Sequence, residues 1–190
     1  MDKLTFYVPI ILATAVYLVR MREILTRRDT IAGPVRENWT LRLFFLVGTA
    51  MTLGSLAEYL MADRPISWMA VVTGVVCAIV SFRLRWRAIS ALGRFWSLHV
   101  EIRENHEFVQ SGPFRFMRHP TYFSMILELL SFGLIFNAWW MLLLIPVAFV
   151  PVLIMRLRLE EPALVEKFGD AYRDYQRRVP MLLPYKWPRR

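Results

Sequence analysis

The sequence PTYFSMILELLSFGLIFNAWWMLLLIPVAFVPVLIM, residues 120–155, is the most informative part of this chain for its fold. It holds two apolar runs, residues 120–136 and 139–155, which are separated by a single asparagine and a single alanine. Each run is long enough to cross a lipid bilayer as a helix, which takes roughly 17–25 residues. The only charged residue in the two runs is Glu128. The stretch therefore predicts a tight hairpin of two membrane-spanning helices.

Three further apolar stretches precede the hairpin, at residues 4–19, 43–62 and 68–82. The third is short by itself and is extended by arginines, Arg85 among them, whose apolar stems can snorkel toward the membrane surface. A chain of 190 residues cannot supply enough polar surface to bury five such stretches in a soluble bundle. We therefore expect an all-α integral membrane protein with five transmembrane helices in one domain, residues 1–190.

Composition and missing motifs exclude several classes of protein. With 56% hydrophobic residues, the chain is not disordered, because disorder goes with low hydrophobicity. The single cysteine, Cys77, excludes a disulfide framework and a multi-cysteine metal site, and the three histidines are too scattered to predict a metal ion. No G-x-G-x-x-G motif follows a strand pattern, so we expect no Rossmann domain.

The basic residues predict the orientation in the membrane. The net charge is +9, and 22 of the 24 lysines and arginines follow the first, third and fifth apolar stretches, on one side of the bilayer. Because basic residues in short loops stay cytoplasmic, we expect the N-terminus outside and the C-terminus and polar site in the cytoplasm. The first stretch is expected to be a retained anchor, since its basic residues follow it. Topology and membrane lipid explain the charge, so no nucleic-acid partner is predicted.

The chain divides after residue 92. Residues 1–92 hold the first three predicted spans, whereas residues 93–190 hold a connector, the hairpin and a polar C-terminal segment. Gly93 is expected to end the third helix, and residues 100–109 suggest two short extended pieces. Pro120 suits the first position of the next helix, because its fixed φ is helical and it lacks an N–H group.

Several ionisable residues flank the hairpin. His119 precedes the proline-started helix, where free backbone N–H groups can bind an anion, although such a histidine is more often a cap or a packed residue. Beyond the hairpin, Arg156 and Glu160 are four residues apart and share a helix face, while Glu161 points about 100° away. These residues form either an exposed interfacial helix or a polar site that holds a charged small molecule.

Glu128 lies about 12 Å into the predicted fourth span at 1.5 Å per residue. A carboxyl group at that depth is expected to face the bundle or a polar cavity. It either bonds to a neighbouring helix or takes part in binding substrate.

The motifs of the second half resemble a known family. The run GPFRFMRHPTY, residues 112–122, is followed by the hairpin, by R-x-x-x-E-E and by F-G-x-x-Y-x-x-Y. Over residues 91–185 this order is similar to that of the isoprenylcysteine carboxyl methyltransferase family, within a wider group of small membrane methyltransferases. The resemblance implies S-adenosylmethionine as methyl donor and S-adenosylhomocysteine as product. It also implies a cofactor-binding region in the C-terminal half, at the cytoplasmic face.

The resemblance also assigns site residues by position. The residues expected to shape the adenosine pocket, largely through backbone groups, are His106, Phe108, Val109 and Gly112. Those expected near the amino acid portion of the donor are Arg118, His119, Pro120 and Tyr122. Those matching the arginine, the paired acids and the first tyrosine of the later motifs are Arg156, Glu160, Glu161 and Tyr172.

Two residues depart from the family pattern. Phe114 stands where tyrosine is usual, which removes a hydroxyl group. Ser124 stands where glycine is usual, and its side chain is expected to narrow the space available for close helix packing. Neither change removes a group that is charged at neutral pH, so the resemblance still implies an active enzyme.

The chemistry of methyl transfer favours a carboxylate acceptor. Transfer from a sulfonium is an in-line displacement, so much of the acceleration comes from placing the acceptor correctly. A carboxylate is already ionised at neutral pH and needs only a cation to orient it. We expect Arg156 to do this by bidentate pairing, with Glu160 holding the other face of the guanidinium. An amine acceptor would need a base and would be repelled by the arginine.

The sequence therefore predicts carboxyl O-methylation of a lipophilic, isoprenylcysteine-like acceptor. The acceptor's tail would enter sideways from the bilayer, and the donor would enter from the cytoplasm. Three alternatives stay open: a phospholipid N-methyltransferase, a membrane reductase that uses NADPH, and a non-enzymatic membrane assembly protein.

Overall fold

The computed structural model describes residues 3–26, 39–62, 65–93 and 109–185, and all regular structure within these residues is helical. The helices are α1 (Lys3–Leu25), α2 (Trp39–Met61), α3 (Trp68–Leu92), α4 (Pro120–Ile135), α5 (Trp139–Leu144), α6 (Val150–Phe168) and α7 (Asp170–Arg178). A 3-10 turn, η2 (Gly112–Arg115), precedes α4, and a π-helical turn, η3 (Ile145–Phe149), joins α5 to α6. The all-α prediction is confirmed for this part of the chain.

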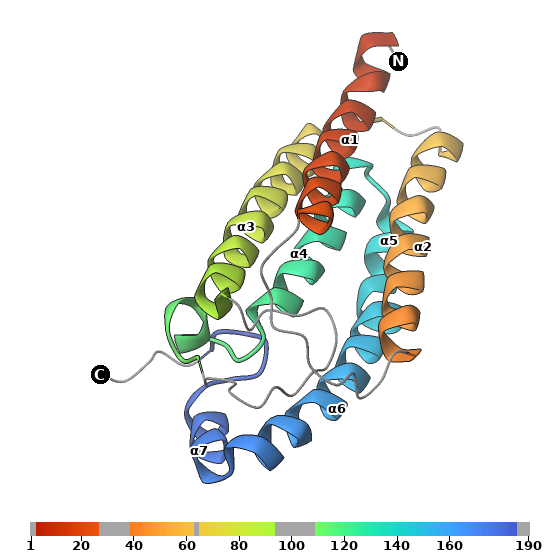
Figure 1. Cartoon of the computed structure of the whole chain (residues 1–190). Coiled ribbons are helices and arrows are strands. Elements are labelled where there is room, and N and C mark those ends of the chain that lie inside the picture. The colour runs from red at the N-terminus through yellow and green to blue at the C-terminus, as the bar shows by residue number, and fades with distance from the viewer. Residues whose placement is uncertain (1–2, 27–38, 63–64, 94–108, 186–190) are drawn as a thin grey trace.

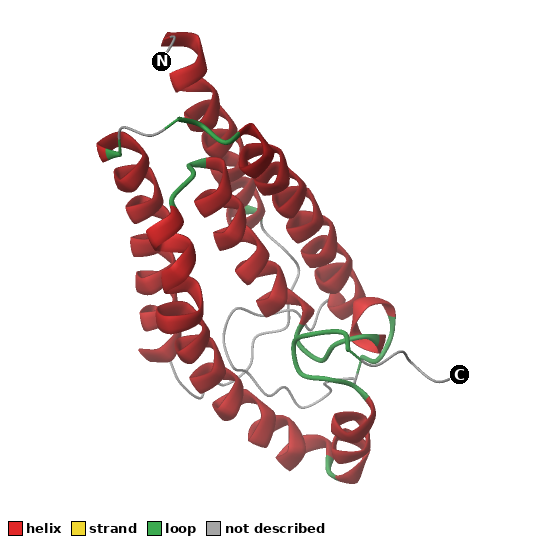
Figure 2. Ribbon diagram, turned by 180° about the vertical axis from the view of Figure 1, so that it is seen from behind, coloured by secondary structure: helices red, strands yellow, loops and turns green. Residues whose placement is uncertain are grey.

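The helices form one bundle (Figures 1 and 2). α1, α2, α3, α4 and the continuous α5–α6 helix lie side by side, and α7 packs at the end of the bundle where α6 finishes. α4 contacts α1, α2, α3 and α5 and is the central helix. Two apolar clusters form the core on either side of α4, one centred on Phe132 and Ile135 and one on Phe149 and Leu153.

Four helices are long and apolar enough to cross a membrane: α1, α2, α3 and the helix from Trp139 to Phe168. α4 has 16 residues and is shorter than these four. The prediction of five spans is therefore supported for four, and α4 is an apolar helix that runs beside them. The long helices continue past the predicted apolar runs, because arginine and glutamate are good helix formers and prolong the backbone hydrogen bonding.

The predicted hairpin is present between α4 and α5. Asn137 adopts a positive φ of 53°, a conformation that asparagine tolerates better than most residues. Its side-chain oxygen accepts a hydrogen bond of 2.7 Å from the backbone N–H of Ser67, which ties the turn to the start of α3. Pro120 begins α4 and Gly93 follows the last residue of α3, both as predicted.

α3 and α4 make the closest helix contact in the bundle. A Cβ atom on Gly74 would lie 2.9 Å from the carbonyl oxygen of Ser131, so the two backbones touch at this glycine. Lower down, the Ser81 hydroxyl donates to the Ser124 carbonyl at 2.6 Å, and the Ser124 hydroxyl accepts from Arg85 Nε at 2.8 Å. Ser124, which was expected to narrow the packing, instead provides a hydrogen bond between the helices.

Arg85 does not snorkel, contrary to the prediction. Only 1% of the residue is exposed, and its Nη2 donates to Glu128 Oε2 at 2.5 Å. Glu128 therefore faces the bundle, as predicted, and bonds to a neighbouring helix. Arg20 Nε lies 3.6 Å from Glu128 Oε1, and Arg20 also pairs with Glu23 at 2.8 Å. We call Arg20, Glu23, Arg85 and Glu128 the Arg85 cluster; opposite charges inside the bundle offset the desolvation that snorkelling would avoid.

Candidate active site

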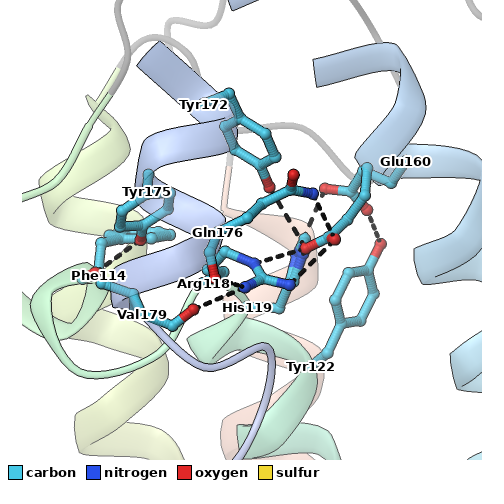
Figure 3. Close-up of polar contacts among 10 residues, drawn as sticks. Phe114, Arg118, His119, Tyr122, Glu160, Tyr172, Tyr175, Gln176 and Val179 are labelled. Carbon is cyan, nitrogen blue, oxygen red and sulfur yellow. Dashed lines mark hydrogen bonds and ion pairs between the residues drawn. The ribbon is translucent and has the colours of Figure 1, made fainter. Parts of the chain in front are cut away.

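Four segments meet beside the N-terminus of α4 (Figure 3). They are the first turn of α4, the middle of α6, helix α7 and the segment after α7. The backbone N–H of Arg118 donates to Pro180 O at 2.9 Å, and that of His119 donates to Met181 O at 3.0 Å. These two bonds fix the segment after α7 to the residues that precede α4, so motifs distant in the sequence become neighbours.

Glu161 is the centre of this site and is 8% exposed. Arg118 donates to both carboxylate oxygens, from Nε at 2.7 Å and from Nη2 at 3.0 Å. His119 Nε2 lies 3.0 Å from Oε1, Gln176 Nε2 donates to Oε2 at 2.8 Å, and the Tyr172 hydroxyl donates at 3.5 Å. We call these five residues the Glu161 cluster. Its carboxylate is bonded on both oxygens, so it acts as a fixed anchor for the side chains around it.

Arg118 connects the anchor to the end of α7. Its Nη1 donates to the backbone oxygens of Gln176 at 3.0 Å and of Val179 at 2.6 Å. The Tyr175 hydroxyl donates to Phe114 O at 2.6 Å and ties α7 to η2 as well. Phe114 thus contributes its carbonyl group here, and the hydroxyl that the family pattern would place on its ring takes no part in this contact.

Arg156, Tyr122 and Glu160 form a second chain of contacts beside the Glu161 cluster. Arg156 is 1% exposed, and its Nε donates to the Tyr122 hydroxyl at 2.8 Å. That hydroxyl donates in turn to Glu160 Oε2 at 2.7 Å, and Arg156 Nη1 donates to Thr40 Oγ1 at 3.3 Å. Arg156 and Glu160 share a helix face as predicted, and the hydroxyl of Tyr122 connects them.

The two tyrosines of α7 are buried donors. Burial raises the pKa of Tyr172, and the carboxylates of Glu161 and Glu160 raise it further. Burial also raises the pKa of Tyr175. Both phenols therefore stay neutral at physiological pH and donate hydrogen bonds, Tyr172 to a carboxylate and Tyr175 to a carbonyl oxygen.

The structure brings most of the predicted site residues together. The residues that meet at the site are Arg118, His119, Tyr122, Arg156, Glu160, Glu161 and Tyr172, with Pro120 starting the helix between them. Gly112 lies beside α3, where a Cβ on it would be 3.7 Å from the Cβ of Ala91, and Val109 is half-buried ahead of η2. His106, Phe108 and most of the predicted extended pieces lie outside the described residues.

Sequence reasoning missed two contributors. Gln176 directly follows the second tyrosine of the F-G-x-x-Y-x-x-Y motif, and a polar residue beside that motif was a usable signal. Thr40 is fully buried on α2 and bonds to Arg156, 116 positions away in the sequence, a contact that no sequence pattern indicates. Within the described residues, no three metal-ligating side chains gather in one place.

A family model and one named relative indicate the same family. The family model for isoprenylcysteine carboxyl methyltransferases matches residues 72–166, which include α4 and the Glu160–Glu161 pair. A protein-S-isoprenylcysteine O-methyltransferase of Schizosaccharomyces pombe is 29% identical over 103 residues, which is 53% of this chain and 44% of that protein.

Two bacterial relatives have other names. The uncharacterized protein YpbQ of Bacillus subtilis is 33% identical over 125 residues, covering 65% of this chain and 69% of that protein. The cobalt-zinc-cadmium resistance protein CzcN of Cupriavidus metallidurans is 26% identical over 147 residues, covering 68% of each chain.

Proposed function

The chain belongs to the isoprenylcysteine carboxyl methyltransferase family, and we propose that it transfers a methyl group from S-adenosylmethionine to the carboxylate of a lipophilic, isoprenylcysteine-like acceptor. The chain is a multi-pass membrane protein, as its long apolar helices and its family indicate. The reaction takes place where the bundle meets the cytoplasm, at the site formed by α4, α6 and α7.

The environment of Arg156 carries the proposal. Its guanidinium is buried and donates hydrogen bonds to the hydroxyl groups of Tyr122 and Thr40. These contacts help to fix the plane of the guanidinium. A carboxylate acceptor would provide the opposite charge in the planar, two-point geometry that arginine favours.

The residues beside Arg156 fit the amino acid portion of the donor, which carries an ammonium and a carboxylate group. The side chain of Glu160 is 25% exposed, and its Oε1 lies 3.9 Å from His119 Nδ1, beyond hydrogen-bond distance. Glu160 would therefore hold the ammonium group, with His119 and Tyr172 beside it. When bound, S-adenosylmethionine supplies an electrophilic methyl group. The adenosine pocket remains assigned to His106, Phe108, Val109 and Gly112.

Each side chain has a separate task in this reaction. Arg156 orients the acceptor oxygen, and Tyr122 holds Arg156 and Glu160 at a fixed separation. The Glu161 cluster fixes the imidazole of His119 and the backbone of residues 176–179. No general base is needed, because a carboxylate acceptor is ionised at neutral pH.

The membrane arrangement completes the proposal. α4 crosses the bilayer as a fifth span, so that the N-terminus lies outside and the C-terminus and the site lie in the cytoplasm. The basic residues that follow the first, third and fifth apolar stretches support this orientation.

Calorimetry and a single substitution test the proposal. The purified protein should bind S-adenosylhomocysteine and not NADPH, and it should methylate N-acetyl-S-farnesylcysteine. Arg156→Lys should reduce transfer by roughly ten- to a hundred-fold, because an ammonium group cannot replace a planar contact of about 1.5–3 kcal/mol. Its affinity for S-adenosylhomocysteine should stay within a few-fold. Full activity of Arg156→Lys would remove Arg156 from the acceptor site, and NADPH binding would favour a reductase.

A further inference from the structure

Thr40 is the second residue of α2 and is fully buried, at the end of the bundle where the site lies (Figure 1). The buried residues of α2 share the side that faces the bundle, and they are Thr40, Phe44, Met51, Ser55 and Tyr59. A buried hydroxyl group needs a hydrogen-bond partner. Ser55 donates to a carbonyl of its own helix, Met51 O, at 2.9 Å, whereas Thr40 accepts from Arg156 on α6 at 3.3 Å. Thr40 therefore connects α2 to the proposed site.

Two helices hold the guanidinium of Arg156. Its Nε donates to the hydroxyl group of Tyr122 on α4 at 2.8 Å, and its Nη1 donates to that of Thr40 on α2 at 3.3 Å. A guanidinium is planar, so bonds from two of its nitrogens to separate helices define the direction in which its plane faces. The bond to Tyr122 by itself would let the plane swing, and Thr40 supplies the second point.

Packing places Thr40 independently of its bond to Arg156. Phe44 follows one turn later, and its ring centre lies 6.1 Å from that of Tyr122 at an interplanar angle of 76°, an edge-to-face pair. The ring centre of Phe44 also lies 4.8 Å from that of Phe149. These contacts hold α2 beside α4 and η3, and the branched Cβ of threonine restricts the rotation of its side chain in a helix. The hydroxyl group is thus a fixed point against which the guanidinium is oriented.

We propose, resting on the function proposed above, that Thr40 is a positioning residue for methyl transfer. It acts through Arg156, whose guanidinium it directs toward the acceptor carboxylate. Correct placement of the acceptor provides much of the acceleration, so a loosened guanidinium lowers the rate even when its charge is kept. α2 lies outside residues 72–166, which match the family model, so this role extends the site to a helix that the match does not cover.

Thr40→Val tests the hydroxyl group, because valine keeps the branched shape and loses the oxygen. In methyl transfer by the full chain to N-acetyl-S-farnesylcysteine, kcat should fall about five-fold. KM for this acceptor and affinity for S-adenosylhomocysteine should stay within about two-fold, since Arg156 keeps its charge. A threonine with only a structural role would lower Tm and leave kcat of the folded chain unchanged, and that result would overturn the proposal.

Thr40→Ser and Thr52→Val are the matched variants. Thr40→Ser restores the hydroxyl group and should recover kcat to within about two-fold of the unmodified chain. An equal loss of kcat in Thr40→Ser and Thr40→Val would overturn the proposal, because packing would then account for both. Thr52→Val is the same substitution three turns further along α2, where the hydroxyl group donates to Gly48 O of its own helix at 3.0 Å, and it should match the unmodified chain.

A double variant tests whether Thr40 acts through Arg156. In Arg156→Lys, the further change Thr40→Val should alter kcat by less than about two-fold, because an ammonium group has no plane to orient. Losses that multiply, as for independent sites, would overturn the proposal.

Rotation of the Arg156 guanidinium can be measured without turnover. Its Nη signals in ¹⁵N NMR of the full chain can be assigned by their absence in Arg156→Lys. They should be separate in the unmodified chain and in Thr40→Ser, because the bond to the hydroxyl group hinders rotation, and should merge in Thr40→Val. Separate signals in Thr40→Val would overturn the inference. Hindered rotation in a chain that binds no S-adenosylhomocysteine would instead overturn the proposed function.

Discussion

The bundle contains two groups of buried charges that differ in how completely they are bonded. In the Glu161 cluster both carboxylate oxygens accept hydrogen bonds, and all three nitrogens of Arg118 donate. In the Arg85 cluster, Nη1 of Arg85 is buried without a hydrogen-bond partner among the described residues and lies 3.8 Å from Glu23 Oε2. Glu161 and Arg118 therefore use all of their side-chain oxygens and nitrogens in hydrogen bonds, whereas Arg85 has one buried nitrogen that makes none to the residues that the structure describes.

The two clusters hold different parts of the protein together, and this accounts for the difference in their hydrogen bonding. The Glu161 cluster joins backbone segments to side chains and fixes a site at the end of the bundle, where exact placement of groups determines the rate. The Arg85 cluster joins α1, α3 and α4 and forms part of a cavity wall through Arg20 and Glu128. We therefore expect changes in the first to affect ligand binding and changes in the second to affect stability.

The largest expected effect is the loss of stability in Glu128→Ala. Removing this carboxylate leaves Arg85 buried without its principal partner, and breaking a buried ion pair in this way costs about 3–5 kcal/mol. Thermal unfolding in detergent should show a large fall in Tm. Replacing both Arg85 and Glu128 by leucine should recover most of the loss, since Arg20 and Glu23 remain paired. Equal destabilisation by the single and double variants would contradict a structural role for the pair.

His119→Ala should separate the two clusters by ligand binding. The substitution removes a hydrogen bond to Glu161 and an imidazole beside Glu160, so affinity for S-adenosylhomocysteine should fall roughly ten- to a hundred-fold. Glu128→Gln, the control in the other cluster, should change that affinity by less than about two-fold while lowering Tm. Calorimetry measures both variants, and an equal loss of affinity in both would show that the clusters do not act separately.

The two clusters also differ in how many of their residues could be predicted from the sequence. Arg118, His119 and Glu161 were selected as site residues because they lie in short motifs whose order resembles a family, but their bonding to one another and to Gln176 was not predicted. Arg85 was not selected, because it lies at the end of an apolar run, where an arginine that snorkels and one that is buried give the same pattern. Its partners come from α1 and α4, and the packing of helices distant in the sequence decides which of the two occurs.

The bundle itself followed from apolar runs and turn residues. Asn137 and Pro120 marked the ends of helices correctly, since their backbone preferences are local. Thr40 could not be predicted, because its contact with Arg156 depends on the position of α2 beside α6. Local chemistry thus predicted the elements and motif residues, whereas contacts between distant helices needed the structure.

Tyr122 and Ser124 each have a hydroxyl group that accepts a hydrogen bond from a buried arginine, so removing each hydroxyl compares the two regions more finely. Tyr122→Phe removes the oxygen that accepts from Arg156 and donates to Glu160, so methyl transfer should fall several-fold, as loss of bonds worth about 1 kcal/mol each implies. Ser124→Ala removes the oxygen that accepts from Arg85 and should lower Tm with little effect on rate. Radiolabelled transfer and thermal unfolding measure the two effects. If Tyr122 contacts the donor directly, Tyr122→Phe will also weaken S-adenosylhomocysteine binding.

The smallest expected effect is on the stability of the folded chain at alkaline pH. Burial and the neighbouring carboxylates raise the pKa of Tyr172, and burial raises that of Tyr175, so the folded chain keeps phenolic protons that the unfolded chain loses above pH about 10. The stability that these protons provide is fully present below that pH and is lost as pH rises beyond it. Tm should therefore fall more steeply above pH about 10 in the unmodified chain than in Tyr172→Phe. Glu128→Gln, whose cluster contains no tyrosine, should keep the steep fall, and equal slopes in all three would show that Tyr172 is not protected from ionisation.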